Sequence, residues 1–130
     1  MAGMAMRHDK DPRQALLDAV GNLQDVELFH NQVLVAVYVR GDTTRGGIIL
    51  PDQTRDEDEH QGKVGLIVKK GPNAFEDPDG KWAWGDEMDL NDWIFFRAAD
   101  GWGIKINGVM CRILSDVSVR GRVQSPDQVW

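Results

Sequence analysis

Residues 33–39 read Val-Leu-Val-Ala-Val-Tyr-Val, an apolar run whose side chains alternate between the two faces of an extended chain. One face carries valine at every position, and the other carries leucine, alanine and tyrosine. A strand that is apolar on both faces is usually covered on both sides. We therefore expect this strand to lie inside the domain, with packed side chains above and below it.

Further short apolar runs follow this strand and are separated by turn residues. The runs are Gly62 to Lys70, Trp93 to Ala99, Gly103 to Ile106, Val109 to Leu114 and Val117 to Val119. The turn signals are Asp79-Gly80, Asp100-Gly101 and Asn107-Gly108. Many short strands at this spacing predict an all-β fold, a small antiparallel barrel or sandwich. The clearest two-residue hairpin is Asn107-Gly108.

A short amphipathic helix is predicted before the first strand. Asp11 precedes Pro12, and Gln14 follows three residues after Asp11, which is typical of a helix start. Apolar residues then recur at helical spacing, which predicts a helix over about residues 12–24, although Gly21 weakens that pattern. Such a helix could pack on its own domain or contact a neighbouring subunit, and the sequence leaves both possibilities open.

Length and charge exclude several classes of protein. The chain has 130 residues, which favours one domain. Its 15 basic and 21 acidic residues give a net charge of -6, so nucleic acid is not an expected partner. No apolar run is long enough to cross a membrane, and the N-terminus lacks a secretion signal, so we expect a cytoplasmic protein. The single cysteine, Cys111, is expected to be a small buried thiol.

Residues 40–61 form a long polar connection with a short apolar centre. That centre reads Gly46-Gly47-Ile48-Ile49-Leu50-Pro51. Three aliphatic side chains in a charged loop indicate a peptide that docks on a partner, although Ile48 and Leu50 could instead fold back onto the barrel. Burial of each such side chain contributes about 1.5 to 3 kcal/mol, while ordering each residue costs about 1 to 2 kcal/mol. One copy would bind weakly, whereas several copies on a ring would gain avidity.

No residue pattern points to catalysis or to a cofactor. The three histidines, His8, His30 and His60, are scattered and lack metal-ligand spacing. The acidic run from Asp56 to Glu59 is more typical of a solvated segment than of a cation site. The serines lack the context of a nucleophile. We therefore expect no enzyme activity, no metal and no cofactor.

Several separated segments resemble the chaperonin-10 family, the GroES co-chaperonins. Their order and spacing agree with the family over about residues 28–120. The matching segments are Phe29 to Val35, Gly46 to Pro51, Gly62-Lys63-Val64 with Gly71-Pro72, Leu90 to Phe96, and Val109 to Val119. The resemblance implies a GroES-like β-barrel over residues 28–120, with a mobile loop at 40–61 and a roof-type hairpin at 73–89. Residues 1–27 are then an N-terminal extension with a short helix, and 121–130 a C-terminal tail.

The resemblance also implies a function and partners. Gly46, Gly47, Ile48, Ile49 and Leu50 would bind an apolar groove of a GroEL-type chaperonin. That chaperonin binds the ATP, so this chain needs no nucleotide. Protomers would form a homo-oligomer, expected to be a heptamer, that caps the chaperonin while a client protein folds. The first and last strands would pair between neighbours, at an interface that includes Val33, Val35, Val37, Val117 and Val119.

The chain also departs from the family pattern. Both termini extend beyond the usual ends, and Asn91 replaces a glycine, although asparagine tolerates a left-handed backbone. The aromatic residues Phe75, Trp82 and Trp84 could flank a roof hairpin or form contacts in an assembly. The departures favour a divergent or bacteriophage-encoded member, which would act in the host cytoplasm. The alternative function is a virion structural protein, for capsid or decoration, built on the same barrel.

Overall fold

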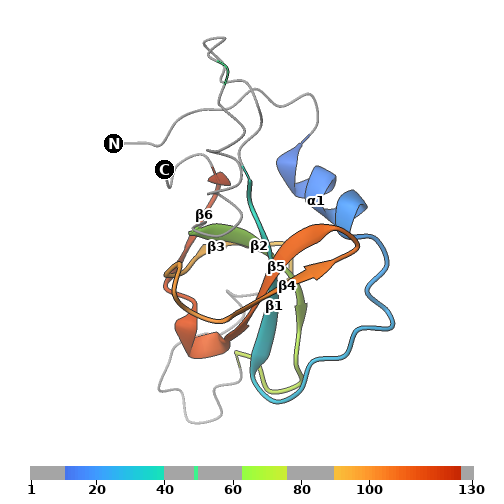
Figure 1. The fold of residues 1–130 in the computed structure, drawn as a ribbon. Helices are drawn as coiled ribbons and strands as arrows, with labels where there is room; N and C mark the ends of the chain where they lie inside the picture. Colours follow the sequence, from blue (N-terminus) through green and yellow to red (C-terminus); the bar gives the residue numbers. More distant parts are fainter. Residues whose placement is uncertain (1–10, 40–48, 50–62, 76–89, 127–130) are drawn as a thin grey trace.

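The computed structural model describes residues 11–39, 49, 63–75 and 90–126. Within these ranges six strands form one antiparallel sheet in the order β4-β5-β1-β2-β3-β6 (Figure 1). The strands are β1 Gln32–Val37, β2 Val64–Lys70, β3 Trp93–Phe95, β4 Trp102–Ile106, β5 Val109–Ser115 and β6 Gly121–Val123. The helix α1 covers Pro12–Val20, and the 3-10 helix η1 covers Asp116–Ser118. The prediction of an all-β antiparallel fold is confirmed.

Strand β1 is the central strand of the sheet and is buried on both faces, as its sequence predicts. It pairs with β5 on one side and with β2 on the other. Val33, Val35 and Val37 enter one apolar cluster, while Leu34 and Ala36 enter a second cluster on the opposite face. All five side chains have 1% or less of their surface exposed. The strand thus joins the two layers of the core.

The first cluster is enclosed by the sheet itself. Strands β1, β2, β3 and β5 all contribute to it, and Phe75 and Val119 close it from outside the strands. Strands that share one cluster must curve around it, as the rolled sheet in Figure 1 shows. A register shift between Leu34 and Val35 marks a bulge in β1, a feature that bends a strand and increases its twist.

Helix α1 begins as predicted and ends earlier than predicted. The carboxylate of Asp11 accepts a hydrogen bond from the Arg13 N–H at 3.2 Å, and proline occupies the first helical position. The helix ends at Val20, because Gly21 adopts a positive φ of 73° and its N–H donates back to the Leu17 carbonyl. The prediction of residues 12–24 was therefore too long, since Gly21 stops the helix.

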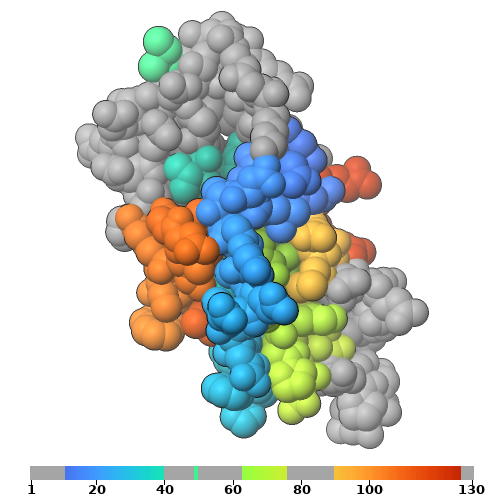
Figure 2. Space-filling model, turned by 90° about the vertical axis from the view of Figure 1, so that its right-hand side faces the viewer, coloured from blue at the N-terminus to red at the C-terminus, as the bar shows by residue number. Residues whose placement is uncertain are grey.

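Helix α1 packs on the second face of its own sheet. Val20 is buried against the cluster of Leu34 and Ala36, and Leu16 packs beside it. Figure 2 shows the helix and the segment after it lying between the β4–β5 hairpin and β2. Side chains of the sheet also bind this segment, since Lys69 donates to the Leu23 carbonyl and Asn107 donates to the Val20 carbonyl. The helix is therefore part of the folded core.

Two predicted backbone features are confirmed. Asn107 and Gly108 both have positive φ, 52° and 81°, and they connect β4 to β5 as a tight hairpin. Asn91 has a φ of 71°, the left-handed conformation that the family pattern assigns to glycine. At both positions asparagine replaces glycine at modest cost, because its short polar side chain tolerates this conformation.

The end of the sheet differs from the prediction. Of the residues predicted as the strand Val117 to Val119, the first two lie in the η1 turn and Val119 caps its end. The last strand is Gly121–Val123, inside the predicted tail. The cause is Asp116, whose buried carboxylate accepts hydrogen bonds from the Asn31 side chain at 2.8 Å and from the Phe75 N–H at 2.9 Å. These bonds draw the chain inward and place the next strand beside β3.

Part of the prediction lies outside the described residues. This holds for Gly46, Gly47, Ile48 and Leu50, for residues 76–89 of the predicted roof hairpin, and for both chain ends. Within the described ranges, no helix is long and apolar enough to span a membrane.

Gly65 and Gly103 provide a matched test of this packing. A Cβ at Gly65 would lie 2.6 Å from the Ala36 carbonyl oxygen and closer still to the Val35 side chain. At Gly103 the nearest atom, the Met110 sulfur, is 3.8 Å away. We expect Gly65→Ala to lower the free energy of unfolding by about 1 to 3 kcal/mol, and Gly103→Ala to change it by less than about 0.5 kcal/mol. Urea denaturation measures both, and equal effects would contradict this packing.

Asp116 is predicted to stabilise the η1 turn. Asp116→Ala removes the acceptor of the buried Phe75 N–H, which should lower the free energy of unfolding by about 1 to 3 kcal/mol. The control is Asp25→Ala, at an exposed carboxylate, with an expected effect within about 0.5 kcal/mol. A loss at Asp116 no larger than at Asp25 in chemical denaturation would show that these hydrogen bonds do not hold the turn.

Candidate functional site

Ile49 is the described residue of the predicted chaperonin-binding segment. Its side chain is 75% exposed, more than any other large hydrophobic side chain in the described ranges. An isolated exposed aliphatic side chain needs no special explanation. Ile49 is informative because the sequence sets it between two further aliphatic residues, Ile48 and Leu50. The backbone of Ile49 also forms an isolated β-bridge.

The two ends of the predicted loop are held side by side. The loop follows β1 and precedes β2, and these strands pair so that Val37 lies opposite Gly65. Beyond the strand, the Tyr38 N–H donates to the Val64 carbonyl at 3.0 Å. The Tyr38 ring packs edge-on against Trp93, with 5.8 Å between ring centroids. The connection over residues 40–61 therefore departs from and returns to one rigid position in the core.

The predicted subunit interface needs correction. Val33, Val35 and Val37 have 1% or less of their surface exposed within the single chain, so their side chains cannot reach a neighbouring protomer. Strand β1 is also hydrogen-bonded to strands on both sides, so it is not an edge strand. The prediction for these three residues was wrong because the first strand is central.

The other two predicted interface residues differ from each other. Val119 is 9% exposed and belongs to the interior cluster, so its prediction as an interface residue was also wrong. Val117 is 51% exposed and remains available to a neighbour. Of the six described strands, β4 and β6 form the edges of the sheet. The last strand is therefore an edge strand, as the predicted pairing between protomers requires.

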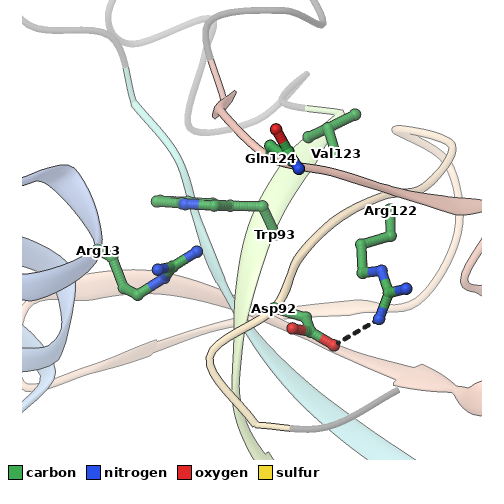
Figure 3. Close-up of a pocket in the computed structure, with 6 residues that line it drawn as sticks. All are labelled: Arg13, Asp92, Trp93, Arg122, Val123 and Gln124. Atoms are coloured by element: carbon green, nitrogen blue, oxygen red, sulfur yellow. Dashed lines mark hydrogen bonds and ion pairs between the residues drawn. The ribbon is translucent and has the colours of Figure 1, made fainter. Parts of the chain in front are cut away.

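A second candidate site lies where α1 meets the β3–β6 side of the sheet. A cavity of about 400 Å³ is lined by residues from three parts of the chain (Figure 3). They are Arg13, Asp92, Trp93, Arg122, Val123 and Gln124. Arg122 donates to the Asp92 carboxylate at 3.3 Å. Sequence reasoning missed this site because its two arginines are far apart in the chain and no local pattern links them.

An ion-pair cluster fixes the turn between β3 and β4. Arg97 contacts the Asp100 carboxylate at 2.9 Å, and Arg120 lies 3.7 Å from the same group. The hydrogen bond from Arg97 holds the pKa of Asp100 below its ordinary value, and the same bond raises the pKa of Arg97. This stabilisation is present above the ordinary pKa of the carboxyl and is lost as the pH falls. Because Arg97 is exposed, we assign the cluster a small, local role.

Cys111 is a buried structural residue, as predicted. Its side chain has no exposed surface and packs with Leu34 and Ala36. Burial raises the pKa of the thiol to about 11. A thiol of this kind is almost fully protonated at neutral pH and is a poor nucleophile.

The described residues give no sign of a metal centre. In these ranges no group of three or more histidine, cysteine, aspartate or glutamate side chains is placed to hold a metal ion. His60 and the acidic run before it lie outside the described residues.

The fold and the predicted loop together define a class of protein. Its members are small all-β chains in which a long connection joins two neighbouring strands at one end of a curved antiparallel sheet. Comparison with known protein families matches residues 25–123 to the family described as Chaperonin 10 Kd subunit. This match covers most of the chain, so the chain belongs to that family, with a GroES-like fold. No curated protein matches the chain.

Membership of this family carries a general function. The family implies a co-chaperonin role, partnership with a GroEL-type chaperonin, and oligomerisation. It is not an enzyme family. The match includes the whole Gly46 to Pro51 segment and also β6, and it begins after α1. Helix α1 is thus an addition to the part that the family shares.

The burial of Cys111 predicts slow chemical modification. At pH 8 the folded protein should react with a disulfide reagent such as Ellman's reagent far more slowly than the urea-unfolded protein, because the thiol is enclosed and protonated. The release of the coloured thiolate measures both rates, and the unfolded protein is the control. Equal rates in the two states would show that the thiol is accessible.

Proposed function

We propose that this protein is a co-chaperonin that caps a GroEL-type chaperonin ring through the segment from Gly46 to Leu50. The observation that carries the proposal is the family match over residues 25–123, which includes this segment. The 75% exposure of Ile49 supports it, because a docking side chain has to be accessible before the partner arrives. Gly46 and Gly47 give the backbone freedom to fit a groove, and Pro51 restricts the exit.

The energetics favour a ring rather than a single copy. Each aliphatic side chain that enters an apolar groove contributes about 1.5 to 3 kcal/mol. Ordering of the segment opposes this gain by about 1 to 2 kcal/mol per residue. The fixed contact between Tyr38 and Val64 confines that cost to the segment itself. Several linked copies convert later contacts into intramolecular ones and raise avidity by about 10² to 10⁴.

The proposed ring is a heptamer in which the last strand takes part. Strand β6, Gly121–Val123, lies at an edge of the described sheet, so a neighbouring chain could extend the ladder there. Such pairing also covers an edge that would otherwise invite aggregation. Val117, which is 51% exposed, is the residue of the predicted interface that we retain.

In this proposal the chaperonin binds and hydrolyses the ATP. This chain would act by closing a chamber in the cytoplasm in which a client protein folds, and it would take no part in hydrolysis. A bacteriophage origin stays a prediction, based on the predicted terminal extensions and the divergent composition of residues 73–89.

Ile49→Asp is expected to abolish binding to a GroEL-type chaperonin, because a carboxylate in an apolar groove loses its hydration without a partner. Size-exclusion chromatography with light scattering, on the protein alone and with chaperonin and nucleotide, measures assembly and binding. The matched control is Trp102→Asp, which changes another exposed apolar side chain on β4 and should bind like the wild type. Retained binding by Ile49→Asp would refute the docking assignment.

The same measurement tests the alternative function. A ring that joins the chaperonin only in the presence of nucleotide would support the co-chaperonin proposal. A monomer, or an assembly that ignores the chaperonin, would contradict it and favour the virion structural role on the same barrel.

A further inference from the structure

The cavity beside α1 has the composition of an anion site. Of the side chains that line it, the charged ones are two arginines and one aspartate, so its lining carries an excess of positive charge. The whole chain, in contrast, has a net charge of -6. A cationic cavity on an acidic protein is not explained by the average composition of its surface.

One donor in this cavity, the Nε–H of the partly buried Arg13, has no hydrogen-bond partner in the part of the chain that the structure describes. This nitrogen is enclosed. A guanidinium carries five N–H donors and no acceptor, so an enclosed Nε–H has to find an acceptor elsewhere. Buried donors in proteins are almost always satisfied. The position of Arg13 therefore indicates an acceptor that comes from outside the described residues.

Arg122 approaches the same cavity from the opposite side. Its Nη1 lies 3.3 Å from the Asp92 carboxylate, and both side chains remain partly exposed, at 42% and 27%. Figure 3 shows Arg13 and Arg122 on either side of Asp92, with Gln124 across the cavity. Asp92 therefore compensates part of the positive charge and orients Arg122, while the Nε–H of Arg13 is left without an acceptor among the described residues.

The backbone around the cavity is fixed before any ligand binds. The Asp92 carbonyl accepts from the Ile67 N–H at 3.1 Å, and the neighbouring Asn91 N–H donates to the Ile67 carbonyl at 2.7 Å. Arg122 lies opposite Ile94 in the β3–β6 ladder. Helix α1 is held at its C-terminal end by Asn107. A site built on such elements needs little reordering to bind.

We propose that this cavity binds an oxyanion, the carboxylate or phosphate group of a ligand, between Arg13 and Arg122. Arginine suits this role because its planar fork matches both groups in a bidentate geometry. Arg13 also lies in the first turn of α1, where the helix dipole favours negative charge. Trp93, which is 2% exposed, forms an apolar wall beside the arginine. This inference is independent of chaperonin docking, since it uses neither the loop nor the ring.

Nuclear magnetic resonance provides a direct test with two probes. The ¹⁵N-labelled full chain is titrated with inorganic phosphate and, separately, with the blocked peptide acetyl-Ala-Glu-Ala-amide, at constant ionic strength. The reporters are the Arg13 Nε–H and the Trp93 indole N–H, which line the cavity. We expect both signals to shift in a saturable manner at millimolar concentrations of at least one probe.

The two probes distinguish the source of the oxyanion. Saturation by phosphate alone indicates that the ligand carries a free phosphate or a phosphate ester. Saturation by the peptide alone indicates a polypeptide carboxylate, and saturation by both indicates that the site accepts either oxyanion. Each of these results supports the site. Shifts that rise without saturation, or that sodium chloride reproduces, would overturn the proposal. Absence of any shift would also overturn it.

Three variants separate a binding role of Arg13 from a structural one. Arg13→Gln should weaken binding at least about tenfold, because it removes the positive charge and the planar guanidinium group that can bind an oxyanion through two N–H donors. Arg13→Lys keeps the charge and should bind with intermediate strength. The control, Arg97→Gln, changes an exposed arginine that does not line the cavity and should bind like the wild type. Equal weakening by Arg97→Gln, or unchanged binding by Arg13→Gln in a chain with an intact amide spectrum, would refute the assignment.

Discussion

The central strand β1 is the constraint on which the rest of this fold depends. Five consecutive apolar side chains, from Val33 to Val37, are buried on alternating sides, so each face of the strand needs its own cover. The curved sheet itself encloses one face. The other face cannot be enclosed in the same way, because a sheet curves in one direction only. A separate element has to cover it.

Helix α1, which lies before the family-matched residues 25–123, supplies much of that cover. Val20 and Leu16 pack over Leu34 and Ala36, and the carbonyls at the end of the helix are bound by the sheet. An addition that buries core residues is part of the folding unit and is not an appendage. It also brings Arg13 to the β3–β6 side of the sheet, where it adds a second arginine beside the ion pair of Arg122 and Asp92.

Features set by neighbours in sequence were predictable, and features set by distant contacts were not. The Asn107-Gly108 hairpin, the Asp11 cap and the burial of β1 each depend on a few adjacent residues. The position of β6 depends instead on the Asp116 carboxylate, whose partners Asn31 and Phe75 lie far away in sequence. The interface prediction failed for a related reason, because the first strand in sequence is not the first strand in the sheet.

The same constraint bears on how the predicted loop could act. A connection that starts at β1 starts from a buried central strand that is paired on both sides. It returns beside that strand, where the Tyr38 N–H donates to the Val64 carbonyl. Docking at Ile49 therefore cannot loosen or shift its base at low cost, so any force transmitted by a partner would reach the core directly. If the connection docks as proposed, its length and its glycine content would influence the affinity of each copy. In the proposed ring, a rigid core would let several weak contacts act together, because each loop base would hold its position while the others bind.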